Sequence, residues 1–411
     1  MRHRSLLILT AVLTTGALTL TACGSRDDSN NSSDDGGGTQ TVVIGLDAPL
    51  TGDLSALGLG IKNSADLAAK QANAKKYVEG VTFEIQALDD QAQPSSGQQN
   101  ATKLAANKKV LGVVGPLNSS VAESMQKVLA DEKLAQVSPA NTSPSLTQGQ
   151  KWNEGTKERP FASYFRTATT DAVQGPFAAQ YLFNDAKKKK VFVIDDKKTY
   201  GAGLAGTFKA EFTKLGGKIA GTEHIDPETK DFSSVATKVK SSGADVVYYG
   251  GEYPAAGPLS KQIKKAGAKI PLVGGDGIYS GEYIKLSGAE GVGDLATSVG
   301  APIESLPSAK DFVANYEKAG YKEPFEAYGG YSYDAAWSII EAVKAVVEAN
   351  DGKLPSDARA KVAEAVGKVD FEGVTGKVSF DEFGDTTNKQ LTVYEYKDGA
   401  WAAVKSGELT S

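Results

Sequence analysis

An alternation of short apolar runs with amphipathic helical patterns constrains the fold of this chain most strongly. It starts near residue 41 and continues through most of the 411 residues. Apolar runs bounded by turn residues are typical of buried strands, and the segments between them repeat apolar residues at helical spacing. Strands that alternate with helices form parallel sheets covered by helices. We therefore predict an α/β fold with two doubly wound, Rossmann-like lobes.

Each lobe is expected to begin with its own series of strands. The first series is expected at residues 41–46, 81–88, 110–114 and 135–138. The second series is expected at residues 191–195, 218–225, 245–249 and 270–273. The rest of the chain is expected to form helices with few new strands. Such a segment suits the completion of a lobe that begins earlier in the sequence. Those helices are expected at residues 308–319, 331–349 and 356–366.

The chain should therefore cross between the lobes several times. Multiple connections form a hinge with a defined axis instead of a loose linker. We expect the crossings near residues 169–171, 300–302 and 385–388. Lobe 1 would then comprise residues 41–169 with 301–386. Lobe 2 would comprise residues 170–300 with 387–411.

The first 40 residues predict an exported, lipid-anchored protein. Arg2 and Arg4 precede an apolar run at residues 6–20, which is too short to span a bilayer and is typical of a signal peptide, here residues 1–22. The sequence LTAC ending at Cys23 resembles the bacterial lipoprotein processing box, in which the cysteine thiol receives diacylglycerol. Cys23 is the only cysteine, so it has no internal disulfide partner. Residues 23–40 are polar and of low complexity, and we expect a flexible tether that holds the protein outside the cytoplasm at the bacterial cell membrane.

Composition disfavours several classes of function. The net charge is −5, and no basic cluster indicates nucleic acid as a partner. Apart from His3 in the predicted signal peptide, His224 is the only histidine, so catalytic triads, Cys-His pairs and histidine-rich zinc sites are excluded. There is no phosphate-binding loop, and the glycines at 58–60 match a dinucleotide fingerprint only in part. We therefore expect no cofactor, no metal and no enzyme activity, although chemistry by carboxylates alone stays open.

Two polar loops are the first candidate site. The strand at 110–114 ends at Gly115-Pro116, and a helical pattern follows from Ser120. A helix N-terminus binds carboxylates or phosphates through its free N–H groups. A second loop at 139–142 follows the next strand, and parallel neighbours place both loops at one sheet edge. Ser119 and Thr142 are candidate ligand contacts, whereas Ser120 with Glu123 fits a capping box.

Seven short motifs occur in a characteristic order. They are GPLNSS at 115–120, SPANTSPSLT at 138–147, FRTATTDAVQGP at 165–176, DKKTYGAGLA at 196–205, KDFSSVATKVK at 230–240, VVYYGGEYPAAG at 246–257 and GDG at 275–277. With these motifs the chain, from residue 41 to about 396, resembles the leucine/isoleucine/valine-binding proteins of bacterial ABC importers. That group has the type I periplasmic binding protein fold, also called the Venus flytrap. The resemblance implies that an amino acid binds between the lobes, the hinge closes, and the closed form docks on a permease.

The resemblance also implies a set of ligand contacts. Ser119 and the backbone N–H of Thr142 would hold the ligand carboxylate. The carbonyl of Ala140 and the hydroxyl of Thr142 would accept from its ammonium group. Lobe 2 would supply Tyr200 and Asp276. A zwitterion needs donors at one end and acceptors at the other, so this set is chemically consistent.

Further positions bear on the choice of ligand. Tyr328 falls opposite a pocket aromatic of the family, and Leu57 replaces an aromatic residue. Glu252 is an additional acid that would favour a cation if it faces the ammonium site, or it could face solvent. We interpret Asp171 as a helix cap or a hinge residue in preference to a ligand contact.

We therefore expect a monomeric lipoprotein that delivers an amino acid, branched-chain or otherwise apolar, to an ABC permease. Three alternatives stay open. A protein of the same fold could bind an amide, a urea-like compound, an aromatic acid or another small metabolite. It could serve a signalling protein instead of a permease. An extracytoplasmic hydrolase with two catalytic carboxylates is the third.

Overall fold

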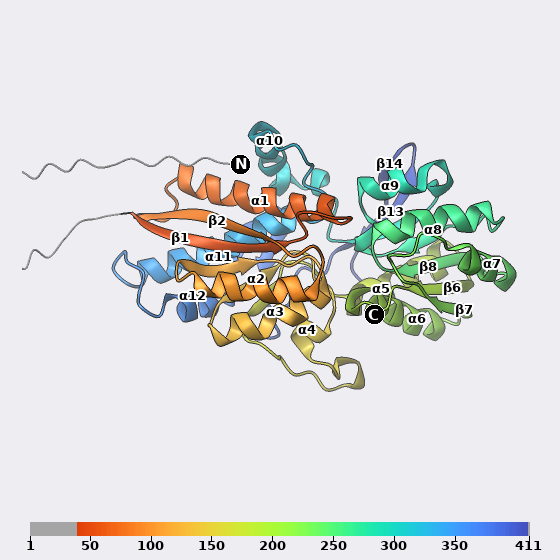
Figure 1. The fold of residues 1–411 in the computed structure, drawn as a ribbon, viewed down its shortest axis with the longest axis horizontal. Helices are drawn as coiled ribbons and strands as arrows, with labels where there is room; N and C mark the ends of the chain where they lie inside the picture. Colours follow the sequence, from red (N-terminus) through yellow and green to blue (C-terminus); the bar gives the residue numbers. More distant parts are fainter. Residues whose placement is uncertain (1–38, 410–411) are drawn as a thin grey trace, which may run out of the picture. The chain divides into compact units, whose positions relative to one another are not determined.

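The computed structural model describes residues 39–409, which contain two main β-sheets (Figure 1). The predicted signal peptide, Cys23 and all but the last two residues of the tether lie outside the described residues. The first sheet has five parallel strands in the order β2-β1-β3-β4-β5. Their bounds are β1 Gln40–Ala48, β2 Val81–Asp89, β3 Val110–Val114, β4 Ala135–Ser138 and β5 Tyr164–Arg166.

The second sheet has seven strands in the order β14-β13-β10-β9-β8-β6-β7. Strands β6 to β10 are parallel, and β13 and β14 extend the sheet in antiparallel fashion. Their bounds are β6 Lys190–Asp195, β7 Lys218–His224, β8 Val246–Gly250, β9 Leu272–Gly274, β10 Leu295–Val299, β13 Leu391–Lys397 and β14 Ala400–Gly407. A separate hairpin joins β11 and β12, with bounds Asp370–Gly373 and Gly376–Ser379.

Helices cover the sheets of both lobes. Lobe 1 carries α1 Ser55–Ala74, α2 Pro94–Ala106, α3 Ser119–Asp131, α4 Ser145–Gln148, α10 Lys310–Ala319, α11 Gly329–Glu348 and α12 Ala358–Val366. Lobe 2 carries α5 Asp171–Gln180, α6 Thr199–Lys214, α7 Ser233–Ser242, α8 Tyr253–Lys265 and α9 Gly281–Ser287. Every residue of β3, β4 and β8 is buried, as expected for parallel strands with both faces covered.

Helices from far along the chain pack against the first sheet. Helices α11 and α12 contact β3 and β4, and α11 also lies against α1. The chain passes between the two sheets after β5, after β10 and after β12. We propose that these three passages mark the lobe boundaries predicted above.

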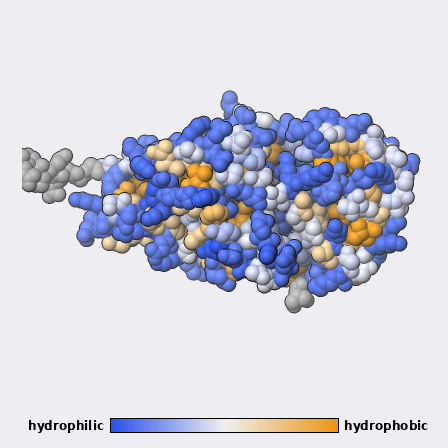
Figure 2. All heavy atoms as spheres, turned by 60° about the horizontal axis from the view of Figure 1, so that its bottom comes forward, coloured by the Kyte–Doolittle hydropathy of each residue, from blue (hydrophilic) through white to orange (hydrophobic). Residues whose placement is uncertain are grey.

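The surface is largely hydrophilic on the face shown in Figure 2, where hydrophobic residues form small separate patches. Among the described residues, the large hydrophobic side chains that are well exposed are Leu286, Val292 and Val404. No helix within residues 39–409 combines the length and the apolar composition needed to cross a bilayer.

Candidate functional site

A small cavity lies between the lobes, at the carboxyl edges of β3 and β4. Lobe 1 lines it with Leu57, Leu117, Asn118, Ser119, Ala140 and Tyr328, and lobe 2 lines it with Tyr200, Glu252 and Gly277. Six of the residues predicted from the sequence are therefore brought together here. The cavity volume is about 20 Å³, which is room for little more than a water molecule. A larger ligand requires the lobes to separate or the wall side chains to shift.

The register of the first sheet brings the two polar loops together. Gly112 pairs with Ala135 and Val114 with Val137, so β3 and β4 end side by side. Gly115 turns the chain there with φ of 112°, and an added Cβ would meet the Asp47 carbonyl oxygen at 2.1 Å. Only glycine fits this turn, which leads the chain directly into α3.

Helix α3 begins with Ser119 at the cavity wall. Asn118, the residue before it, is extended, and no side chain caps the helix. The predicted capping box at Ser120 is therefore wrong, because Glu123 accepts a hydrogen bond from the hydroxyl of Thr199 in lobe 2 at 3.0 Å instead. The first N–H groups of α3 have no intrahelical acceptor, and the helix dipole favours an anion there. The arrangement suits a ligand carboxylate.

Asp276 and Thr142 are buried just behind the cavity wall, not on it. Asp276 Oδ1 accepts hydrogen bonds from the Tyr200 hydroxyl at 2.8 Å and from Gln174 Nε2 at 3.0 Å. Its Oδ2 accepts from the Tyr328 hydroxyl at 2.9 Å, which links lobe 2 to lobe 1. Burial nevertheless raises the pKa of Asp276 above its usual value.

A second acid, Asp171, lies near Asp276. It is fully buried, and burial together with the charge of Asp276 raises its pKa well above the usual value. Its side chain does not cap α5, so the capping interpretation is wrong. Oδ1 accepts from Gln174 Nε2 at 3.2 Å, and the hydroxyl of Thr142 is close enough to the carboxyl group to lower its pKa in part.

The charge of these two carboxylates is not balanced by a neighbouring cation. Within residues 39–409, neither Asp171 nor Asp276 forms a salt bridge, and the nearest compensation is the more distant Arg166. Arg166 is already committed to a 2.6 Å salt bridge with Asp385. A buried carboxyl group without a cation either takes a proton or is stabilised by a positive charge nearby, and an ammonium group between the lobes would supply that charge.

Glu252 faces the cavity wall, so the solvent-facing alternative is wrong. It accepts from Asn118 Nδ2 of lobe 1 at 2.7 Å and from Lys198 Nζ of lobe 2 at 3.1 Å. The Lys198 ammonium group balances its charge, so the expectation that Glu252 favours a cationic ligand is not supported. Burial and the Glu252 charge also raise the pKa of the nearby Asp196 to about 8.

The described residues hold no candidate metal centre. No group of three or more acidic, histidine or cysteine side chains within residues 39–409 could hold a metal ion. His224 ends β7, where its Nδ1 lies 2.7 Å from Asp195 Oδ1.

Comparison with known proteins identifies the family. Residues 41–400 match the family described as periplasmic binding protein. The chain belongs to this family. The Leu/Ile/Val-binding protein homolog 1 of Brucella suis biovar 1 is 34% identical over 359 residues, covering 87% of this chain and 91% of that protein. The predicted family is therefore confirmed.

Solved structures of periplasmic binding proteins confirm the predicted fold. The branched-chain amino acid transporter substrate binding protein LivJ of Streptococcus pneumoniae, in complex with isoleucine, has a TM-score of 0.78 at 25% identity. The match covers 90% of this chain and 99% of that one. The leucine binding protein LivK of Thermotoga maritima has a TM-score of 0.77 at 27% identity, covering 89% and 98% of the two chains.

Proposed function

We propose that this periplasmic binding protein captures an amino acid, branched-chain or otherwise apolar, between its lobes and delivers it to an ABC permease. The observation that carries the proposal is the pair of buried carboxylates, Asp171 and Asp276, behind a cavity walled by both lobes. An ammonium group would balance their charge. The names of the relatives and the isoleucine in the LivJ complex support the same ligand class.

The two poles of the ligand are assigned to opposite ends of the cavity. The carboxylate would lie at the start of α3, against the Ser119 hydroxyl and the Thr142 N–H. The ammonium would lie at the Ala140 carbonyl and the Thr142 hydroxyl, and would draw on Asp276. The side chain would contact Leu57 and Leu117. In this proposal, separating the lobes breaks the Tyr328 bond to Asp276 and admits the ligand, and closure re-forms the wall.

Calorimetry tests the ligand class. The mature chain would be unfolded and refolded to remove any ligand carried through purification, then titrated with each of the twenty amino acids. We expect at least one apolar amino acid to bind with a dissociation constant of about 10 μM or below. Absence of binding at millimolar concentrations for all twenty would contradict the amino-acid proposal.

The membrane anchor is proposed separately, at Cys23. Cleavage before this residue and lipidation of its thiol would place the protein on the outer side of the cytoplasmic membrane, near its permease. Mass spectrometry of the mature N-terminus is expected to show the mass of a diacylglycerol group on Cys23. An unmodified thiol would contradict the anchor without affecting the ligand proposal.

We also propose that the protein acts as a monomer and catalyses no reaction. Support for a monomer comes from the small, separate hydrophobic patches on the face in Figure 2. Stable homodimers usually bury a larger and more apolar surface. Light scattering of the mature chain should give the mass of a single chain.

A further inference from the structure

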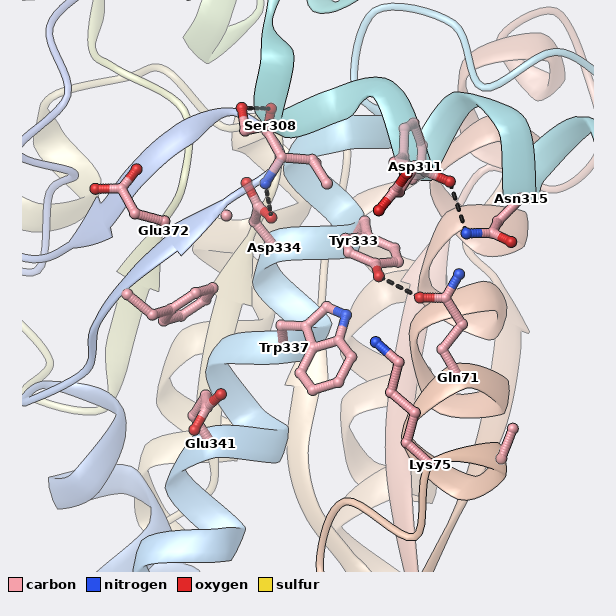
Figure 3. Close-up of a pocket in the computed structure, with 15 residues that line it drawn as sticks. Gln71, Lys75, Ser308, Asp311, Asn315, Tyr333, Asp334, Trp337, Glu341 and Glu372 are labelled. Carbon is pink, nitrogen blue, oxygen red and sulfur yellow. Dashed lines mark hydrogen bonds between the residues drawn. The ribbon is translucent and has the colours of Figure 1, made fainter.

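A second cavity, of about 690 Å³, lies within lobe 1 and shares no residue with the interlobe site (Figure 3). It is lined by α1, by α10 and the turn before it, by α11, and by the hairpin of β11 and β12. A volume of this size is typical of pockets that hold small organic ligands. Because every wall belongs to lobe 1, closure of the two lobes would leave the cavity in place.

Aromatic side chains form the floor of this cavity. Figure 3 shows Trp337 and Tyr333 projecting into it from α11. Phe312 packs on Tyr333 with ring centroids 5.1 Å apart, and Phe371 contributes a further apolar wall. The Trp337 ring is held by Tyr77, whose ring meets it edge-on at 5.0 Å. The floor is therefore both apolar and fixed in orientation.

The indole N–H of Trp337 is a buried donor that lacks an acceptor. Trp337 is 9% exposed, and its Nε1 forms no hydrogen bond within the described residues. In Figure 3 this nitrogen faces the side of the cavity that carries Tyr333, Gln71 and Lys75. The Tyr333 hydroxyl donates to Gln71 and lies beside the indole N–H, but outside hydrogen-bond geometry. A buried donor without a partner is unfavourable, and a bound acceptor would satisfy it.

Four carboxylates line the cavity, together with a single ammonium group, that of Lys75. One of them, Asp334, accepts hydrogen bonds from the backbone N–H groups of Val374 and Thr375. The other three are Asp311, Glu341 and Glu372. Lys75 Nζ lies 5.9 Å from the centre of the Trp337 ring and forms no salt bridge with any of the three. Glu341 accepts from the Tyr77 hydroxyl at 2.5 Å, whereas the carboxylates of Asp311 and Glu372 form neither a salt bridge nor a hydrogen bond within residues 39–409. The excess charge of this cavity is therefore negative.

We propose that the lobe 1 cavity binds a small organic cation, an amine on an apolar or aromatic body. Its ammonium group would lie among Asp311, Glu341 and Glu372, where carboxylates and the face of Trp337 both attract a positive charge. Its body would cover the aromatic floor. A hydroxyl or carbonyl oxygen on that body would accept from Trp337 Nε1–H. This site is separate from the amino-acid site proposed above and does not depend on it.

Titration with matched probes tests the proposal. Tyramine, which carries an ammonium group, an aromatic ring and a hydroxyl, would be compared with 4-hydroxyphenylacetate, which replaces the ammonium by a carboxylate. Binding to the mature chain would be followed by calorimetry. We expect tyramine to bind at submillimolar concentration and 4-hydroxyphenylacetate to bind at least tenfold more weakly. Equal affinities, or no binding of tyramine, would overturn the proposal.

Variants locate the bound amine. Glu372→Gln and Asp311→Asn change exposed residues and should fold normally, and each is expected to weaken tyramine binding about fivefold to tenfold. Glu348→Gln, on α11 but outside the cavity, is the matched control and should leave it unchanged. Asp276→Ala tests the interlobe site, and tyramine binding should survive it. Binding lost in Asp276→Ala but retained in Glu372→Gln would place the amine between the lobes and overturn the proposal.

Discussion

Asp276 accepts three hydrogen bonds, yet its pKa remains raised, because burial outweighs the donors around it. A bound ammonium would change that balance, since an opposite charge stabilises the ionised carboxylate. We therefore expect Asp276→Ala to weaken amino-acid binding by about 100-fold, which corresponds to the loss of one charge-assisted contact.

Asp276→Glu is the matched control, because it keeps the charge and lengthens the side chain by one methylene. We expect it to retain affinity within about tenfold of the parent chain. Calorimetry on the refolded proteins measures both variants. Unchanged affinity in Asp276→Ala would remove this residue from the ligand site.

A second pair of buried carboxylates gives a prediction about stability. Asp47 and Asp90 are fully buried, and their carboxyl groups lie within hydrogen-bonding reach of each other. Burial raises the pKa of Asp90 to about 6 and that of Asp47 well above its usual value. A raised pKa in the folded state stabilises the fold at acidic pH, and this stability is lost as the pH rises through about 6.

Asp90→Asn should reduce this dependence, since the amide can donate to Asp47 at any pH. We expect the variant to gain roughly 1–3 kcal/mol in free energy of unfolding at pH 8, and to match the parent chain near pH 4. Urea unfolding at the two pH values provides the measurement. A gain of equal size at both would show that the two carboxylates do not share a proton.

At the scale of residues, the lobe 1 side of the site could be predicted from the sequence better than the lobe 2 side. Ser119, Ala140 and Thr142 follow parallel neighbouring strands, so their common sheet edge could be deduced. The role of Asp171 could not be decided from the sequence, because an acid at a helix start has the same pattern whether it caps the helix or faces a ligand. The pairing of Glu252 with Lys198 joins residues that are far apart in the sequence, and no local pattern encodes it.

Among the elements, the starts of α3, α6 and α8 meet across the closed lobes. Asn118 precedes α3, Lys198 precedes α6 and Glu252 precedes α8. Their side chains form one chain of hydrogen bonds, Asn118 to Glu252 to Lys198. Each contact between lobes stabilises the closed form relative to the open form, and thereby any ligand held inside it.

Glu252→Gln should weaken this chain of hydrogen bonds between the lobes while leaving both lobes folded. We expect amino-acid affinity to fall about threefold to tenfold, because Lys198 loses its charged partner and the closed form is less favoured. The control is Glu282→Gln, which removes an exposed ion pair with Lys285 on α9. Calorimetry gives the affinities, and a higher affinity in Glu252→Gln would show that this acid opposes the ligand instead.

Elements with long apolar runs were predictable, and short or exposed ones were not. The helix predicted at 331–349 corresponds to α11, whose buried face repeats at helical spacing. Strand β5 has three residues, too few for a pattern to emerge. Strand β14 was also missed, because most of its residues are exposed and it lies at the edge of the sheet beside β13.

In the whole molecule, a buried salt bridge joins two of the three connections between the sheets. Arg166 at the end of β5 meets Asp385, which precedes β13, at 2.6 Å, and both side chains are at most 1% exposed. Arg166 also donates to the carbonyls of Asn141 and Ser143, at 3.0 and 2.7 Å. Burial opposes ionisation of Asp385, but the Arg166 charge keeps its pKa below the usual value.

Asp385→Ala should therefore destabilise the fold severely, because it leaves the Arg166 charge buried without a partner. We expect a loss of about 3–5 kcal/mol in free energy of unfolding. The double variant Arg166→Met with Asp385→Ala, which removes both charges, should recover part of that loss. Thermal and urea unfolding measure both proteins, and a double variant no more stable than Asp385→Ala would argue against this explanation.

The order of the lobe segments along the sequence has a consequence for biogenesis. Lobe 1 needs α11 and α12, which are made after most of lobe 2, and the lobe 2 sheet needs β13 and β14 from the last residues described. Neither half can finish its core until synthesis is nearly complete. A nascent chain whose lobes are completed this late stays incompletely folded during most of its synthesis. This suits passage through a narrow export channel before folding on the far side.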